Sequence, residues 1–266
     1  MKSTSRIREI LIFILTAICI GGVYLINSGQ TALRQTGDVA GQEETINYTL
    51  PPGYVFSIWG LIYLGFIMYA TYGLTRSGAS DPHMKATALP FTISLLLNLA
   101  WTVIVGADEW GWAYPVQWIM LVVAIWLFFK WDMGQRPLSR TQKWMSIPFA
   151  LYAGWVTVAM IPFTASLLNQ WGWDGGPFSR ETWGIILYVL AALIVFLAYL
   201  RLRHPFYLLP LPWALIGFYV RFEENFNIKT AALLTAAVVL GFALRKCYGY
   251  FKIPVNTYPK EVNQTA

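Results

Sequence analysis

The chain has 266 residues, of which 57% are hydrophobic and only 12% are charged. Soluble domains carry about 25% charged residues, so this composition argues against a soluble fold and indicates an integral membrane protein. The formal net charge is +6, and the two cysteines, Cys19 and Cys247, lie too far apart in sequence to indicate a disulfide framework or a metal motif.

Eight segments approach the length of about 20 apolar residues that a membrane helix needs. In chain order they run over roughly residues 9–27, 54–75, 87–107, 113–130, 145–169, 182–201, 205–221 and 229–246. The seventh segment is short and contains Pro210 and Pro212, so a kinked or tilted helix is the alternative there, because proline removes a backbone donor. We therefore expect an all-α integral membrane protein with about eight transmembrane helices.

The connections between these segments divide the basic residues unequally. With eight spans, one side carries only Arg34, Arg180, Arg221 and Lys229, and the other side, which holds both termini, carries all remaining Lys and Arg residues. Basic residues stay on the cytoplasmic side of a membrane, so we expect both termini to be cytoplasmic and the protein to be multi-pass in the cell (inner) membrane. The net positive charge then reflects topology, and we expect no nucleic-acid partner.

The predicted spans lack ionisable side chains away from their ends. Ion-coupled transport, classical haem ligation and acid–base or metal-assisted catalysis all need such groups. We therefore expect no catalytic residues, no metal site, no required cofactor and no enzymatic activity.

Three spans instead carry pairs of polar-tipped aromatic or amide side chains that share one helix face. The pairs are Trp59 with Tyr63, Asn98 with Trp101, and Tyr152 with Trp155. One interpretation is that they bridge helices or belong to interfacial belts, because polar side chains often connect membrane helices. The other interpretation is that these side chains form the wall of a ligand pocket. The tryptophans near the span ends, such as Trp110, are typical of an aromatic belt, with a lid or docking surface as the alternative.

Around these pairs the sequence resembles the tryptophan-rich sensory protein family, the translocator proteins (TspO/MBR). The family's second helix has a Pro-Pro, aromatic, Phe-Gly-Pro-x-Trp pattern followed by Leu-Tyr and Gly. The matching residues are Pro51, Pro52, Tyr54, Phe56, Trp59, Tyr63 and Gly65, with Ser57 and Ile58 replacing the family's Gly-Pro. Two further motifs are matched by Leu97, Asn98 and Trp101, and by Tyr152, Trp155 and Ala159.

This resemblance covers about residues 5–170 and implies a five-helix membrane domain over residues 1–170. Residues 171–250 would add three helices, followed by a cytoplasmic tail at 251–266. The family binds porphyrins and other flat hydrophobic molecules, so the resemblance implies a similar site here, with a bound porphyrin or tetrapyrrole as the candidate ligand. The implied ligand-binding residues are Tyr54, Trp59, Tyr63, Asn98, Trp101, Tyr152 and Trp155.

The leading hypothesis is a membrane receptor or sensor for a flat hydrophobic ligand, such as a tetrapyrrole, another pigment or a sterol-like lipid. The alternatives are a carrier for such a ligand and a non-catalytic assembly partner in a larger membrane complex. Degradation of a bound porphyrin is suggested only by analogy with the family. The expected partners are the lipid bilayer and the hydrophobic ligand, with a homodimer or a membrane-protein partner left open.

Overall fold

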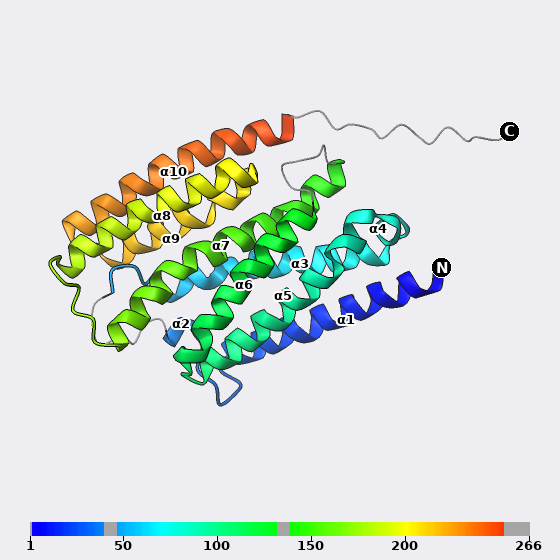
Figure 1. The fold of residues 1–266 in the computed structure, drawn as a ribbon, viewed down its shortest axis with the longest axis horizontal. Helices are drawn as coiled ribbons and strands as arrows, with labels where there is room; N and C mark the ends of the chain where they lie inside the picture. The colour runs from blue at the N-terminus through cyan, green and yellow to red at the C-terminus, as the bar shows by residue number, and fades with distance from the viewer. Residues whose placement is uncertain (1, 40–46, 132–138, 253–266) are drawn as a thin grey trace.

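The computed structural model describes residues 2–39, 47–131 and 139–252, and in those residues it is helical and contains no strand. Figure 1 shows a bundle of long, roughly antiparallel helices. The elements are α1 (Lys2–Asn27), α2 (Thr36–Val39), η1 (Gly53–Ser57), α3 (Ile58–Leu74), α4 (Arg76–Ser80), α5 (Pro82–Gly106), α6 (Trp110–Lys130), α7 (Arg140–Gln170), α8 (Arg180–Leu202), η2 (Pro205–Leu208), α9 (Pro210–Arg221) and α10 (Phe226–Lys252).

Seven helices in the described residues are long and apolar enough to cross a membrane, namely α1, α3 together with η1, α5, α6, α7, α8 and α10. Their outward faces carry large apolar side chains that water would not tolerate in such number. Val122 on α6 is 64% exposed and Val238 on α10 is 74% exposed. A helix that is apolar on all sides is typical of a membrane span, so the predicted all-α membrane fold is confirmed.

The segment predicted as a seventh span, 205–221, differs from the other spans. It forms the short η2 followed by α9, whose 12 residues extend only about 18 Å. The break has a chemical cause, because Pro205 and Pro210 each begin a helix at a position where no backbone donor is needed. The chain still returns across the bundle here, so α1 begins and α10 ends at the same end of the molecule (Figure 1).

The central helix of the bundle is α7. Its most apolar window is 61% buried, whereas the corresponding windows of α8 and α10 are only 22% buried. The helices α1, α3, α5 and α6 lie on one side of α7, and α8, α9 and α10 lie on the other (Figure 1). The predicted boundary at 170/171 therefore falls in the connection between α7 and α8. The predicted tail lies outside the described residues from residue 253 onward.

Local sequence explains where several of these helices begin. Ser139 accepts a hydrogen bond from the backbone N–H of Gln142, and the Gln142 side chain accepts one from the backbone N–H of Ser139, which together make a capping box for α7. Asp81 caps α5 in a related way by accepting from the backbone N–H of His83, and Pro82 occupies the first helical position. These caps fix the starts of the two helices that carry most of the candidate site.

Candidate functional site

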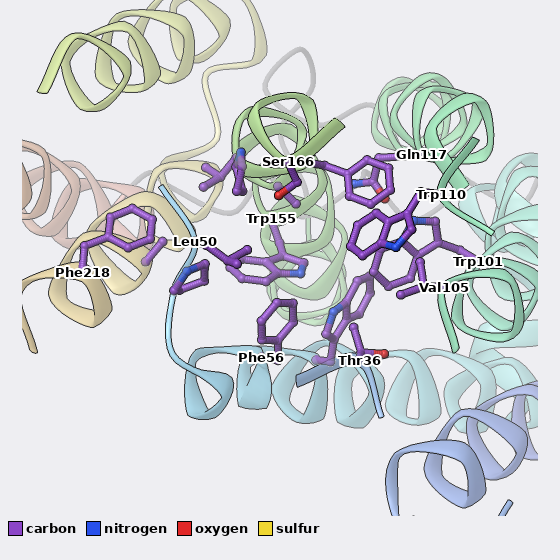
Figure 2. Close-up of a pocket in the computed structure, with 17 residues that line it drawn as sticks. Thr36, Leu50, Phe56, Trp101, Val105, Trp110, Gln117, Trp155, Ser166 and Phe218 are labelled. Carbon is purple, nitrogen blue, oxygen red and sulfur yellow. The ribbon is translucent and has the colours of Figure 1, made fainter. Parts of the chain in front are cut away.

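An aromatic cavity, here called the inner cavity, lies between α3, α5, α6 and α7. Seven aromatic side chains line it: Phe56, Trp59, Trp101, Trp110, Trp155, Phe163 and Phe218. Figure 2 shows Phe56 and Trp155 at one side of this cavity and Trp101 and Trp110 at the other. Its volume is about 60 Å³, so the rings almost fill the space that they surround.

Two ring contacts in this wall are edge to face. The ring of Trp155 is perpendicular to those of Phe56 and Trp59, at interplanar angles of 87° in both cases. On the other side, Trp110 lies 5.2 Å from Phe163 between ring centroids. Edge-to-face contacts place the positive edge of one ring on the negative face of another, which fixes the orientation of the rings. The wall therefore presents both ring faces and ring edges to the cavity.

The polar groups of the inner cavity are few and uncharged. The lining includes the Gln117 amide, the Ser166 hydroxyl and Thr36, and it contains no charged side chain among the described residues. Ser166 accepts a hydrogen bond of 3.1 Å from Asn47, whereas the Gln117 side chain makes no hydrogen bond to another described residue. The indole N–H of Trp101 is buried and also unpartnered. An indole N–H is a donor only, so the wall offers donors to an acceptor on a ligand.

A second and larger space, here called the lateral groove, lies between α1, η1, α3 and α5. Its volume is about 580 Å³. It shares four lining residues with the inner cavity: Thr36, Phe56, Trp59 and Trp101. The three aromatic side chains among them, Phe56, Trp59 and Trp101, form a partition with the inner cavity on one side and the lateral groove on the other.

The seven residues that the sequence analysis singled out occupy different places around these two spaces. Trp59 and Trp101 line both, Trp155 lines only the inner cavity, and Tyr63 lines only the lateral groove. Tyr54 is 48% exposed, lines neither space, and packs edge-on against Trp213 of α9. Asn98 and Tyr152 are buried and also line neither space.

Asn98 and Tyr152 form a bridge between helices. The Asn98 amide donates to the carbonyl oxygen of Ser94 at 2.7 Å and to the hydroxyl of Tyr152 at 3.0 Å, which joins α5 to α7. The Tyr63 hydroxyl lies 3.5 Å from the Asn98 carbonyl oxygen, at the limit of a hydrogen bond. These contacts agree with the helix-bridging interpretation of Asn98.

Several lining residues were not singled out from the sequence as ligand-binding. Trp110 was interpreted as part of an interfacial belt, and Gln117 and Phe163 were not considered. Gln117 had a usable signal, since it is an amide within an otherwise apolar span. It also lies about two helical turns from Trp110, on the same face of α6.

The helix α9 supplies a further wall that the sequence did not predict. Ala214 and Phe218 of α9 line the inner cavity. At Gly217, an added Cβ atom would lie only 2.4 Å from a methyl group of Val55, so glycine allows α9 to approach η1 closely.

Three side chains of α8 and α9 also donate hydrogen bonds to backbone oxygens in and before η1. These donors are Tyr188 to Tyr48, Trp213 to Val55, and Arg221 to both Leu50 and Pro51.

A family model described as TSPO-like protein matches residues 9–245. The chain belongs to the TSPO-like family. The match extends through α8, α9 and most of α10, so it includes the three C-terminal helices that lie beyond the motif resemblance at 5–170. No curated protein and no solved structure matches the chain. Family membership together with the seven apolar helices identifies a multi-pass membrane protein.

Proposed function

We propose that this TSPO-like protein is a membrane receptor or sensor that binds a flat hydrophobic ligand in the inner cavity without catalysing its conversion. One observation carries the proposal. Four tryptophans from four different helices, Trp59 of α3, Trp101 of α5, Trp110 of α6 and Trp155 of α7, line a single cavity. These four ring systems give the cavity an aromatic wall, and ring faces favour a flat π-system as ligand.

The chemistry of the wall narrows the ligand class. The lining is apolar apart from a few uncharged groups, which is the usual composition of a small-molecule site. A porphyrin, another tetrapyrrole or pigment, or a sterol-like lipid meets this requirement, with the part of the ligand that carries acceptors placed near Gln117 and the indole N–H of Trp101.

The size of the cavity implies movement on binding. Ligand pockets usually enclose about 300–1,000 Å³, and the inner cavity encloses only about 60 Å³. The neighbouring lateral groove adds about 580 Å³ behind the partition of Phe56, Trp59 and Trp101. A tetrapyrrole is therefore expected to displace partition side chains toward this groove.

Titration of the purified protein with protoporphyrin tests this proposal. Binding is expected to quench tryptophan fluorescence. Trp101→Ala and Trp155→Ala are each expected to raise the Kd about tenfold, because a lost ring contact is worth roughly 1.4 kcal/mol. Trp112→Ala is the matched control, because Trp112 is 70% exposed and does not line the inner cavity. Equal affinities in all four proteins would contradict the assignment of the site.

A carrier is the second candidate function, and the position of the lateral groove favours it. The groove lies beside the inner cavity and reaches residues such as Leu64, which is 55% exposed on the lipid-facing surface. Flux of protoporphyrin into liposomes that contain the protein distinguishes the two functions. Binding without flux supports the receptor, and flux that Trp101→Ala abolishes supports the carrier.

A further inference from the structure

The lateral groove is open on the side that faces the lipid. Tyr24 of α1 is 68% exposed, and Leu64 and Ile67 of α3 are 55% and 39% exposed, and all three line the groove. In a multi-pass membrane protein the surroundings of these side chains are lipid chains and not water. The groove is therefore accessible from within the bilayer.

The amide side chains of the groove gather at one end, whereas the hydroxyls of Tyr63 and Thr102 in the lining are directed to Asn98. Asn27, Gln35 and Thr36 line the end near α2, whereas Ile20 and Ile67 line the groove away from it. Asn27 is held in place, since its amide donates to the carbonyl oxygen of Val23 and accepts from the backbone N–H of Thr36, both at 3.0 Å. The Gln35 side chain makes no hydrogen bond to another described residue. The groove thus has the polarity of an amphiphile, with a polar end at the membrane surface.

The length of the groove corresponds to one leaflet. From Gly53 to Ile67 the lining follows the axis of η1 and α3 for about 20 Å, at about 1.5 Å per residue. Half of a bilayer with its headgroup regions measures about 20–22 Å. A chain that lies along the groove therefore spans the leaflet on the α2 side.

No charged side chain lines the groove in the described part of the chain. Among the described residues that line it, only Trp101 has a buried polar atom without a partner, its indole N–H; Trp101 is 8% exposed and also borders the inner cavity. The lining can therefore bury an alkyl chain without leaving a charge unpaired, and it places a single donor at its inner side.

We propose that the lateral groove is a binding site for one acyl chain of an amphiphile from the adjacent leaflet. The chain lies along α3 with its polar head near Gln35 and Asn27, and it covers the outer side of the Phe56–Trp59–Trp101 partition. A phospholipid and a free fatty acid share this chemistry. The proposal requires no ligand in the inner cavity. The two spaces share the partition, whereas Trp110 and Trp155 line only the inner cavity, so acyl-chain labelling is measured without protoporphyrin.

Photo-crosslinking in phosphatidylcholine vesicles tests the site. One arm uses phosphatidylcholine with a diazirine in its acyl chain, and the other uses a diazirine fatty acid. Peptides that contain residues 20–27 and 53–67 are expected to take up label in a saturable manner that excess unlabelled probe suppresses. Labelling in the first arm, the second arm or both supports an acyl-chain site, and the arms identify the source of the chain.

A substitution that fills the groove provides the decisive comparison. An added Cβ atom at Gly60 has no neighbour within 4 Å, so the side chain of Gly60→Trp enters the groove without a backbone clash. Gly60→Trp is expected to lower labelling about tenfold, because the indole displaces about two methylenes of the acyl chain from the groove. Gly241→Trp on the exposed face of α10, where an added Cβ also meets nothing, is the matched control and is expected to label normally.

Two results would overturn the proposal. One is labelling that is unsaturable and spread evenly over the lipid-facing helices. The other is a Gly60→Trp protein that labels as strongly as the Gly241→Trp protein. Gly60→Leu, a smaller filling substitution, repeats the comparison if the tryptophan variant does not fold. Protoporphyrin binding measured on the same variants separates failure at the groove from failure at the inner cavity.

Discussion

Asn98 and Gln117 are both amides buried in apolar helices, but their contacts give them different roles. The Asn98 amide donates hydrogen bonds to Ser94 and Tyr152. Its donors are therefore paired within the protein, and the bond to Tyr152 holds α5 against α7. Gln117 lines the inner cavity and has no hydrogen-bond partner in the described chain. An amide that faces a cavity and has no protein partner is available for a hydrogen bond to a ligand.

Gln117→Leu is expected to separate stability from binding. The variant should unfold at the same temperature or a higher one, because an unpaired amide is replaced by an apolar group of similar size, and it should bind protoporphyrin more weakly. Gln142→Leu is the matched control, because the Gln142 amide donates to Asp81 at 3.0 Å. Loss of that hydrogen bond should destabilise the protein by about 1–3 kcal/mol. Thermal unfolding and protoporphyrin titration measure both effects, and destabilisation by Gln117→Leu would contradict the assigned role.

His204 lies between α8 and η2, fully buried, with Nε2 3.0 Å from the Ser146 hydroxyl and Nδ1 without a partner. Burial lowers the pKa of His204 to about 3, so the folded protein holds it neutral. The unfolded chain binds the proton at its ordinary pKa of about 6.5. Stability is therefore expected to fall as the pH decreases from about 6.5 toward 3, by about 1.4 kcal/mol per pH unit from this residue.

The variant His204→Gln checks this expectation, since glutamine does not titrate. Unfolding free energies measured in detergent between these pH values should decrease less steeply for the variant than for the wild-type protein. Identical slopes for both proteins would show that His204 is protonated in the folded state or remains neutral in the unfolded chain.

At the scale of elements, α9 is too short to cross a membrane by itself, and it instead packs within the bundle. It is buried against α7, η1 and α10, and it joins the C-terminal helices to the segment that precedes α3. Arg221 donates to the carbonyl oxygens of Leu50 and Pro51 at 3.1 Å each. Because Leu50 and Pro51 line the inner cavity, α9 holds part of the cavity wall from outside.

Arg221→Gln is expected to loosen this wall. Hydrogen bonds from a charged donor are worth about 1.5–3 kcal/mol, so amide hydrogen exchange in residues 50–57 should accelerate about tenfold or more. Arg245→Gln on the exposed face of α10 is the matched control and should leave this exchange unchanged. Unchanged exchange in Arg221→Gln would show that packing at Gly217 holds the segment without the arginine.

At the scale of the whole molecule, the basic residues gather at one end. In the described residues, the end where α1 begins and α10 ends carries Arg76, Arg140, Arg203 and most other basic residues, and the opposite end carries Arg34, Arg180, Arg221 and Lys229 (Figure 1). We propose on this basis that the basic end is cytoplasmic and that the membrane is the cell (inner) membrane.

Accessibility of single cysteines tests this orientation. In a protein with Cys19 and Cys247 replaced by alanine, Asp174→Cys should react with a membrane-impermeant maleimide on intact bacterial cells, and Ser77→Cys should react only after lysis. Both positions are exposed and lie at opposite ends of the bundle, so each is the control for the other. The reverse pattern would contradict the proposed orientation.

The sequence by itself determined the membrane class, the long helices and the family. The reason is local, since continuous apolar segments of about 20 residues specify a membrane helix whatever their neighbours are. The Trp59, Asn98 and Trp155 motifs likewise drew attention to α3, α5 and α7, because residues three or four apart share a helix face.

Only the tertiary structure decided which of those side chains meet. Asn98 donates a hydrogen bond to the Tyr152 hydroxyl, and Tyr54 packs against Trp213. The lining of the inner cavity also includes Trp110, Gln117 and Phe218. These pairings join residues separated by tens of positions and depend on how helices cross, which no local spacing encodes. The position of α9 also depends on tertiary contacts. This 12-residue helix is held by hydrogen bonds to the backbone oxygens of Val55, Leu50 and Pro51, and its own apolar length is too short to specify a membrane span.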